Sequence, residues 1–520
     1  MPQFHAASPL LLGVDVGTSS AKAVLADIEG RFFASSTSSY RYAMPEPGRA
    51  EQDPDDWWRA VCLTIRELLS RYPETRSRLQ AVGVSGQGVA AVLLGHDGKP
   101  LRDAILWLDT RSAAHSANLD ELHGARLALI SGKKPAPYNV EPKLLWIREN
   151  EPATWHKLWK VTTTTGYVTL CLTDEAVMNH SDAGILLSYD LQNRRWSHEA
   201  MKCMDLPAHI FCDLAPCHQI IGRVTSRAAE ETGLPTGLPV IAGGEDTSSA
   251  GLAMGVVSED QIQLSMGTAT TLYAPVRHVR PVSNLLAFPH VIEDLTLVGG
   301  SMVGGGATVD WLLKTLGAET SESQKALLDE LTTKAGSIDA GSGGLIFLPY
   351  LAGELQPIND GFARGLFFGL ELRTTNAHLF RAVLEGTAFA IAHNVEVARR
   401  PEATSSRIVA VGGPTRNDLW CQVIADATGF AVDAMEEQGG AALGDAILAG
   451  MGAGLFTDPL TMQRAHAKRR ASFLPRSTAR AEYKRLFSIY LELYPRLHDL
   501  FPKLPATKPL SEEVKENVPI

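Results

Sequence analysis

The chain is predicted to fold as an α/β protein built from two like-folded halves. Runs of β-prone residues alternate with longer segments of helical periodicity, which is typical of α/β architectures. A short strand–turn–strand pattern also occurs twice, at residues 11–27 and 263–274, about half the chain apart. In both copies an apolar run leads into Gly-Thr and further small residues, and a second β-prone run follows.

The length of 520 residues is too great for one compact core, so several domains are expected. We place the main boundary near residues 254–260. This predicts an N-terminal domain over residues 1–255 and a C-terminal domain over residues 256–490. Residues 491–520 would then hold the end of a C-terminal helix and a polar tail.

In the N-terminal half, residues 57–71 place apolar side chains at helical spacing, and either Asp53 or Asp56 would cap that helix. Residues 79–94 predict a strand, a glycine-rich turn and a second strand. Residues 104–111 form a short apolar run that ends in charged and polar groups. Residues 239–255 predict a buried strand, a glycine turn and a helix at the end of the N-terminal half. The elements expected in the C-terminal half are a long helix over 374–397, a buried strand over 408–413, and helices over 417–428 and 441–453.

Composition excludes several classes of function. The formal net charge of −10 argues against a nucleic-acid-binding surface, which needs a basic stripe. A phosphorylated ligand remains compatible, because a few donors and Mg²⁺ can reverse the local field. The six cysteines include no Cys-x-x-Cys pair, and the N-terminus has neither a charged leader nor a long apolar run. We therefore expect a cytoplasmic protein without membrane contact.

Asp15 is the first candidate for chemistry, because it lies in a predicted strand just before Gly17-Thr18. A turn without bulky side chains lets backbone N–H groups approach an anion closely. A carboxylate there would repel phosphate directly, so its role would be exerted through Mg²⁺. The alternative is a hairpin whose Asp only hydrogen-bonds its own turn. The second Gly-Thr copy favours the first interpretation.

The second candidate is the pair of carboxylates in Gly243-Gly244-Glu245-Asp246, which a buried strand delivers to its end. Ligands of open α/β sheets lie at that end. A carboxylate there can accept a proton from a substrate hydroxyl and orient it for phosphoryl transfer. The alternative is that Asp246 is only a helix cap, because Asp followed by Thr-Ser-Ser suits that position.

A third glycine-rich segment, Gly412-Gly413, follows a predicted strand and would let a base or ribose lie against the backbone. It lacks the G-x-G-x-x-G spacing of dinucleotide-binding folds. The chain also lacks the G-x-x-x-x-G-K-[ST] pattern of a P-loop, so a P-loop fold is not expected.

Taken together, the motifs of this chain resemble those of the FGGY carbohydrate kinases, in the same order along almost the whole sequence. Within that family the chain is most similar to the xylulose kinases, especially over residues 48–58 and 347–357. The motifs are Asp15-Val-Gly-Thr-Ser, Trp107-Leu-Asp-Thr-Arg, Gly243-Gly-Glu-Asp, Ser265-Met-Gly-Thr, Gly369-Leu-Glu-Leu-Arg-Thr and Gly412-Gly-Pro-Thr-Arg-Asn.

This resemblance implies two actin-like (ribonuclease H-like) domains that flank a catalytic cleft, and ATP-dependent phosphorylation of a sugar or polyol hydroxyl. It implies that Asp246 is the catalytic base and that Asp15 is the carboxylate for Mg²⁺. The residues expected to bind ATP are Gly17, Thr18, Ser19, Lys22, Gly267, Thr268, Gly305, Gly412, Gly413 and Asn417. The residues expected around the sugar are Gln87, Gly88, Val89, Trp107, Asp109, Arg111 and Glu245, with Asp109 and Arg111 at the rim of the pocket.

One segment departs from the family pattern. Xylulose kinases typically have Gly-Gln-Met-His-Gly where this chain has Gly86-Gln87-Gly88-Val89-Ala90. The chain thus loses an imidazole and considerable volume in the expected sugar pocket, and losing a hydrogen-bond partner should change the preferred sugar. The alternative is that another side chain fills the gap and D-xylulose is retained.

We therefore predict a pentulose kinase that most readily converts D-xylulose to D-xylulose 5-phosphate, with ATP and Mg²⁺ as cofactors. Two alternatives stay open: a kinase for L-xylulose, ribulose, glycerol or a tetritol, and a non-catalytic actin-like sugar sensor that uses ATP. The predicted partners are the small-molecule sugar and ATP, with no nucleic acid and no membrane. A homodimer is an alternative to the monomer that the sequence leaves open.

Overall fold

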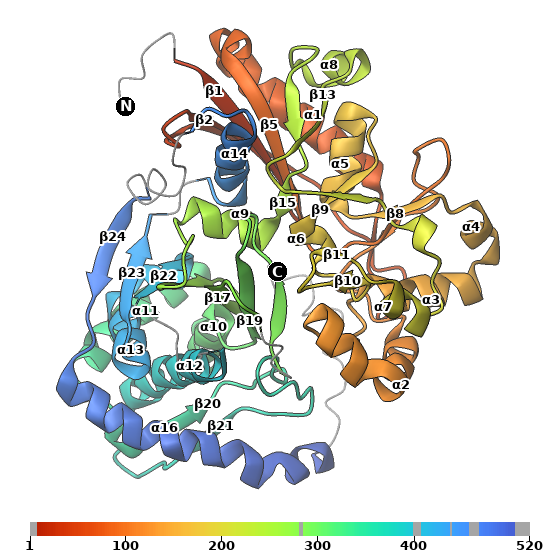
Figure 1. Ribbon diagram of the computed structural model, residues 1–520. Helices are drawn as coiled ribbons and strands as arrows, with labels where there is room; N and C mark the ends of the chain where they lie inside the picture. Colours follow the sequence, from red (N-terminus) through yellow and green to blue (C-terminus); the bar gives the residue numbers. More distant parts are fainter. Residues whose placement is uncertain (1–7, 280–283, 399–406, 437–438, 457–466, 505–520) are drawn as a thin grey trace. The chain divides into compact units, whose positions relative to one another are not determined.

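The computed structural model describes residues 8–279, 284–398, 407–436, 439–456 and 467–504 (Figure 1). The chain forms two compact units. The N-terminal unit comprises Met1–Ser258, Pro275–Leu297 and Glu437–Ala467, and the C-terminal unit comprises Glu259–Ala274, Val298–Glu436 and Lys468–Ile520.

The N-terminal unit is built on a mixed sheet in the order β13-β14-β5-β1-β2-β3, with β15 also paired to β5. Strand β1 pairs antiparallel with β2 and parallel with β5, and it is buried along almost its whole length. The strands are β1 (Leu10–Val16), β2 (Ser20–Asp27), β3 (Phe32–Ser39), β5 (Leu79–Gly86), β13 (Ile220–Arg223), β14 (Pro239–Ile241) and β15 (Gly244–Glu245).

Helices cover this sheet and extend the unit beyond it (Figure 1). They include α1 (Pro54–Arg71), α2 (Ala113–Ser131), α3 (Val140–Asn150), α5 (Thr164–Thr173), α8 (Ser226–Thr232), α9 (Asp246–Ala253) and α14 (Ala441–Gly452). The predicted cap of α1 is Asp53, whose side chain accepts a hydrogen bond from the backbone N–H of Asp55. Asp56, the alternative, lies inside the helix.

Helix α14 belongs to the N-terminal unit although it comes late in the sequence. It packs directly on β1 and β5, where glycines replace side chains. A Cβ atom on Gly13 would lie 1.8 Å from the carbonyl oxygen of Ala442, and one on Gly83 would lie 2.2 Å from that of Asp445. Only glycine permits such close contact between backbones.

The C-terminal unit holds a second mixed sheet that contains the order β19-β17-β16-β22-β23-β24. Its strands are β16 (Gln261–Met266), β17 (Thr270–Val276), β19 (Thr296–Met302), β22 (Arg407–Val411), β23 (Ala431–Met435) and β24 (Arg469–Phe473), and its helices include α10 (Gly306–Thr315), α11 (Ser321–Gly336), α12 (Asn376–Ala398), α13 (Asp418–Thr428) and α16 (Ser477–Leu497). Buried residues of both layers, including Phe347, Phe380 and Tyr483, form one apolar core.

The α/β class and both hairpins are confirmed, but the single cut between domains is too simple. The first change of unit does fall between Ser258 and Glu259, within the predicted boundary region. However, residues 275–297 and 437–467 return to the N-terminal unit, and a division at residue 490 would fall inside α16. None of the helices in the described ranges has the length and hydropathy that a membrane span requires.

Candidate active site

Three carboxylates lie at the carboxyl end of β5 and its neighbours. In the parallel register, Asp15 of β1 lies opposite Ser85 of β5, and Gly244-Glu245 of β15 lies opposite Ser85-Gly86 from the other side. Asp246 follows as the first residue of α9. The structure thus brings Asp15, Glu245 and Asp246 together at one edge of the sheet, and ligands of open α/β sheets bind at such an edge.

The carboxylates strongly influence each other. Burial, and then the charge of Asp246, raises the pKa of Asp15 to about 7, although a hydrogen bond from the Ser85 hydroxyl at 3.1 Å opposes the shift. Burial and the neighbouring Glu245 raise the pKa of Asp246 well above its ordinary value. Carboxylates with strongly raised pKa values at a ligand-binding edge are candidates for a functional site.

Asp246 is not the cap of α9. The cap is Glu245, whose Oε2 accepts a hydrogen bond from the backbone N–H of Ser248 at 2.9 Å. Asp246 instead accepts hydrogen bonds at Oδ1 from the backbone N–H and the hydroxyl of Thr247, at 2.6 and 3.1 Å. The interpretation of Asp246 as only a helix cap is therefore wrong.

Asp445 is a member of this cluster that the sequence reasoning missed. It lies on α14, fully buried, and its Oδ1 accepts a hydrogen bond from the Ser249 hydroxyl of α9 at 2.7 Å. Its Oδ2 is buried without a hydrogen-bond partner among the described residues. Burial and the charges of Asp15 and Asp246 raise its pKa well above the ordinary value. The sequence feature that points to Asp445 is its position as a single acid in the otherwise apolar helix 441–452.

The Gly88-Val89 segment lies against the carboxylate cluster. A Cβ atom built on Gly88 would be 2.9 Å from Cδ1 of Ile185 and 3.5 Å from Oε1 of Glu245. Val89 is buried, and so is Gln87, whose amide donates a hydrogen bond to Oε1 of Gln52 at 3.0 Å. The segment therefore places Gly88 beside Glu245.

The Trp107–Arg111 segment divides into an exposed and a buried part. Trp107 is 41% exposed, and its indole N–H donates to the Thr18 hydroxyl at 3.3 Å. Asp109 is fully buried and accepts from the backbone N–H of Ala50 at 2.7 Å. Arg111 forms ion pairs of 2.7 Å with both Asp109 and Glu51. Asp109 and Arg111, which are predicted to lie at the rim of the sugar pocket, thus pair with each other and with Glu51 in the interior, and their contact with the sugar stays a prediction.

Two polar side chains, those of Tyr40 and Gln52, hydrogen-bond to the backbone of the first Gly-Thr turn. The backbone N–H of Gly17 donates to the carbonyl of Ser20 at 3.0 Å. The Tyr40 hydroxyl donates to the carbonyl of Gly17, and the Gln52 amide donates to that of Thr18. Lys22 lies opposite Asp15 in the β1–β2 ladder. Thr18 and Ser19 thus remain at an accessible turn beside Asp15.

In the C-terminal unit, the predicted nucleotide residues gather at the carboxyl ends of β16 and β22. The backbone N–H groups of Gly306 and Ala307, at the start of α10, donate to the carbonyls of Gly267 and Thr268 at 2.8 and 3.1 Å. A Cβ atom on Gly305 would lie 2.7 Å from the Thr268 carbonyl, so the two segments touch backbone to backbone.

Gly412 joins this cluster through an equally close approach. Its φ is +103°, and a Cβ atom would lie 1.9 Å from the carbonyl of Met266, whereas one on Gly413 would meet nothing within 4 Å. The Asn417 side chain caps α13 and also donates to the Thr332 hydroxyl at 3.0 Å. Asn417 therefore shapes this cluster from a helix N-terminus.

The residues around Asp15 are compatible with Mg²⁺. Among the described residues, no group of three or more His, Cys, Asp or Glu side chains is arranged to hold a metal ion. Mg²⁺ does not need such a group, because it commonly binds one or two carboxylates together with substrate phosphates. The raised pKa of Asp15 reflects burial and the negative charge of Asp246, which a divalent cation would offset.

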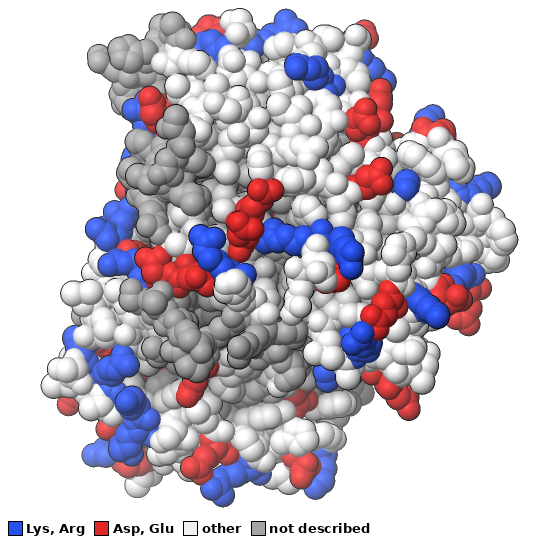
Figure 2. All heavy atoms as spheres, viewed as in Figure 1, with Lys and Arg blue, Asp and Glu red and all other residues white. Residues whose placement is uncertain are grey.

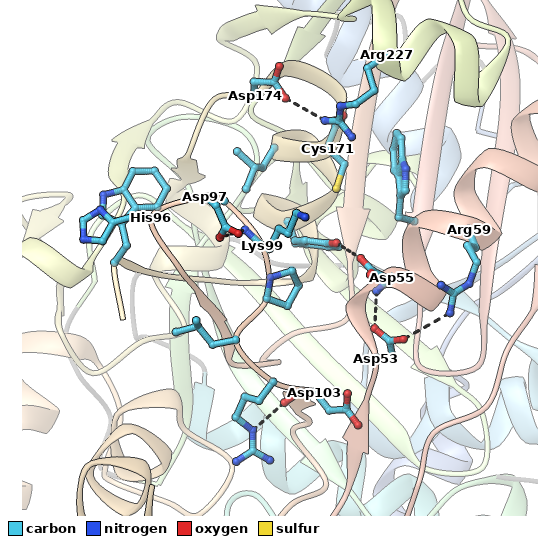
Figure 3. Close-up of a pocket in the computed structure, with 18 of the residues that line it drawn as sticks. Asp53, Asp55, Arg59, His96, Asp97, Lys99, Asp103, Cys171, Asp174 and Arg227 are labelled. Carbon is cyan, nitrogen blue, oxygen red and sulfur yellow. Dashed lines mark hydrogen bonds and ion pairs between the residues drawn. The ribbon is translucent and has the colours of Figure 1, made fainter. Parts of the chain in front are cut away.

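A hollow of about 960 Å³ lies elsewhere in the N-terminal unit, between the start of α1, the loop 96–103, α5 and α8 (Figure 3). Neither Asp15 nor Asp246 lines it. Several of its charged groups pair with one another, as Asp174 does with Arg227 at 2.9 Å, and Asp55 accepts from the Tyr167 hydroxyl. On the face drawn in Figure 2, the described Lys and Arg side chains are interspersed with Asp and Glu rather than gathered in a basic stripe.

Comparison with protein families identifies the chain. Residues 10–253 match the N-terminal domain, and residues 262–453 the C-terminal domain, of the FGGY family of carbohydrate kinases. The chain belongs to this family. It is therefore an ATP-dependent carbohydrate kinase with two actin-like domains.

Individual relatives agree over nearly the whole length. The xylulose kinase of Escherichia coli K12 is 30% identical over 496 residues, which cover 93% of this chain and all of the relative. The crystal structure of xylulose kinase from Rhodospirillum rubrum matches with a TM-score of 0.88 at 30% identity, covering 95% of this chain and 99% of that one. The structure of gluconate kinase from Lactobacillus acidophilus matches with a TM-score of 0.89 at 25% identity, with the same coverages.

Proposed function

We propose that this kinase phosphorylates a hydroxyl of a pentulose, with D-xylulose converted to D-xylulose 5-phosphate and Asp246 acting as general base. The observation that carries the proposal is the position of Asp246 at the carboxyl edge of the sheet beside Asp15, with the capping role taken by Glu245. The Asp246 carboxylate is thus not the helix cap, although its Oδ1 accepts hydrogen bonds from Thr247. The xylulose kinases among the relatives support the choice of sugar.

In the proposed reaction, Asp246 takes the proton of the acceptor hydroxyl while that oxygen attacks the γ-phosphorus of ATP. The new phosphorus–oxygen bond forms as the bond to the ADP oxygen breaks, so one phosphoryl group moves and one proton is released. Asp15 would hold Mg²⁺, which when bound neutralises charge on the phosphates. Ser85 positions Asp15 of β1 through the hydrogen bond from its hydroxyl. Asp445 positions α9, the helix that begins at Asp246, through the hydrogen bond that it accepts from Ser249.

The two glycine-rich turns would bind the phosphates and the nucleotide. In the N-terminal unit the residues are Gly17, Thr18, Ser19 and Lys22. In the C-terminal unit they are Gly267, Thr268, Gly305, Gly412, Gly413 and Asn417. The glycines among them keep bulky side chains away from an approaching anion, although the N–H groups of Gly17 and Gly267 donate within their own turns, to the carbonyls of Ser20 and Ala269.

The acceptor is the least constrained part of the proposal. The Gly88-Val89 segment differs from the pattern expected for xylulose kinases, so L-xylulose, ribulose, glycerol or a tetritol is the second candidate. The comparisons also leave the charge of the acceptor open, because structures named xylulose kinase and gluconate kinase match this chain equally well. A cytoplasmic location and a homodimer complete the proposal.

The decisive experiment is ADP release measured with a panel of keto sugars and polyols, for the wild type and for Asp246→Asn. We expect D-xylulose to stimulate ADP release, and we expect the variant to lose at least about 1,000-fold in kcat. Binding of a fluorescent ATP analogue should survive in Asp246→Asn, which serves as the control for folding. Normal turnover by the variant would refute the assignment of the base. Stimulation only by another acceptor would move the proposal to that sugar, and no stimulation by any acceptor would favour the sensor.

A further inference from the structure

We propose that Glu354 is a positioning residue for nucleotide binding, because it holds the run of glycines through which α10 reaches the second Gly-Thr turn, Gly267-Thr268. The inference rests on the proposed function, which assigns phosphate binding to the Gly-Thr turns. It gives a role to a residue outside the carboxylate cluster, and this role is exerted through the backbone of residues 303–306.

Three consecutive glycines, residues 304–306, lead from β19 into α10. A Cβ atom on Gly305 would lie 2.7 Å from the carbonyl oxygen of Thr268. One on Gly306 would lie 2.9 Å from the carbonyl oxygen of Gly267. Glycine allows this close approach, but it also leaves the backbone free to adopt many conformations. The glycine run therefore needs hydrogen bonds from other segments to fix its path.

Hydrogen bonds hold the glycine run at both ends. At the α10 end, the backbone N–H groups of Gly306 and Ala307 donate to the carbonyls of the Gly-Thr turn at 2.8 and 3.1 Å. At the β19 end, the backbone N–H of Val303 donates to Oε1 of Glu354 at 2.8 Å. The position of the turn against α10 therefore depends on the hydrogen bond that Glu354 accepts.

Glu354 is itself held in place. It is buried, and its backbone N–H and carbonyl pair with the carbonyl and N–H of Asp360, both at 2.9 Å. The backbone N–H of Gln356 donates to the carbonyl of Ser301 in β19 at 3.0 Å, and its Oε1 accepts from the Ser301 N–H at 2.9 Å. The Asn394 amide of α12 donates to the carbonyl of Gln356 at 2.9 Å. Residues 354–356 thus form a fixed base that connects β19 and α12 to the glycine run.

The contact with Val303 does not require Glu354 to be ionised. Burial raises the pKa of Glu354 to about 7, and a carboxyl oxygen accepts hydrogen bonds in both the neutral and the ionised form. Among the described residues Oε2 has no hydrogen-bond partner, so the hydrogen bonds of this side chain are accepted by Oε1. Glutamine at this position would keep the acceptor, whereas methionine, of similar length, would remove it. The two substitutions therefore separate the hydrogen bond from the volume of the side chain.

The test compares Glu354→Met with Glu354→Gln. Isothermal titration calorimetry with ADP measures nucleotide affinity without turnover, and steady-state kinetics give the KM values. In Glu354→Met we expect the Kd for ADP and the KM for ATP to rise at least about tenfold, because a displaced turn no longer matches the phosphates. In Glu354→Gln both constants should stay within about twofold of the wild type, since the acceptor is kept. The KM for the sugar should change less than about twofold in either variant, because the proposed sugar residues lie in the other unit.

Glu385→Gln is the control for a general loss of stability. Glu385 is a second buried glutamate of the C-terminal unit, and it forms an ion pair of 2.8 Å with Arg381. Its other hydrogen bonds go to Gly341, Ser342 and Tyr483 rather than to the glycine run. Glu385→Gln should therefore unfold at a lower temperature than the wild type but keep the wild-type Kd for ADP.

An unchanged Kd for ADP in Glu354→Met would overturn the inference, and so would an equal rise in Glu354→Gln or in Glu385→Gln. If Glu354→Met does not fold, Glu354→Asp replaces it, because the shorter side chain withdraws its oxygens from Val303. The same rise in Kd is then expected, and wild-type affinity would overturn the inference. Gly267→Ala tests the turn independently. If Gly267→Ala raises the KM for ATP but Glu354→Met does not, this inference alone fails, whereas no rise in either variant also refutes the proposed binding of phosphate at this turn.

Discussion

The two Gly-Thr hairpins of this kinase share one backbone design but differ in chemistry. In each, an antiparallel pair of strands surrounds a short turn, and the first strand also pairs in parallel with a strand that ends in a glycine-rich segment. The β1–β2 hairpin carries Asp15 at the position where the β16–β17 hairpin carries Ser265. The first lies among carboxylates, and the second among backbone groups of Gly305 and Gly412.

This difference teaches that the repeated element fixes where a ligand can approach, and that the surrounding residues fix what it meets. The residues that α9 and α14 place near β1 are acids. Around β16, they are glycines and the first N–H groups of α10. Under the proposed function, the first hairpin lies beside the acids for proton transfer and Mg²⁺, whereas both turns approach the phosphates.

The largest expected difference is in kcat, between a substitution of Asp15 and the matched substitution of Ser265. Asp15→Asn should lower kcat by about 1,000-fold, because it removes the carboxylate that we propose for Mg²⁺. Ser265→Ala, the matched change in the second hairpin, should lower kcat by less than about fivefold, since backbone groups carry that turn. Steady-state kinetics at saturating ATP and Mg²⁺ measure both. Equal losses in the two variants would show that the hairpins are chemically equivalent and would break the comparison.

The next largest effect concerns the hairpin of the C-terminal unit, beside which Gly412 lies. Gly412→Ala should lower the free energy of unfolding by about 3 kcal/mol, because the residue has φ of +103° and its Cβ would meet the Met266 carbonyl at 1.9 Å. Gly413→Ala is the control, since its Cβ meets open space. Thermal and urea unfolding report the difference. Equal stability of the two variants would contradict the close approach of β16 and β22.

These hairpins and their Gly-Thr turns could be predicted from the sequence, because alternating patterns and glycine act locally. The helix bounds around 417–428 and 441–453 were also close, for the same reason. The return of α14 to the N-terminal unit could not be predicted, since it depends on Gly13 and Gly83, which permit backbone contact with a helix far later in the sequence. The place of Asp445 depends on the same long-range contact, and the pairing of Arg111 with Asp109 and Glu51 likewise joins residues that no local pattern links.

A third prediction concerns the buried acids of the N-terminal unit and uses Asp182. This residue is fully buried, and its burial raises its pKa to about 7. The folded state therefore binds a proton that the unfolded state has released, so its contribution to stability is complete below pH 3.8 and is lost as pH rises toward 7. Asp182→Asn should remove this loss and gain about 4 kcal/mol relative to wild type between pH 4 and 7.5. Unfolding midpoints at both pH values measure the gain. A variant that follows the wild-type pH dependence would show that Asp182 is ionised in the fold.

The smallest effect compares the two turn glycines directly. A Cβ atom would lie 3.6 Å from its nearest neighbour at Gly17 and 3.7 Å at Gly267, so neither alanine variant should lose stability. Each methyl group would nevertheless stand where a phosphate must approach the backbone, and each should raise the KM for ATP about fivefold with little change in the KM for sugar. An increase in only one variant would assign the phosphates to one hairpin. An increase in neither would remove the Gly-Thr turns from ATP binding and leave their similarity as a property of the fold alone.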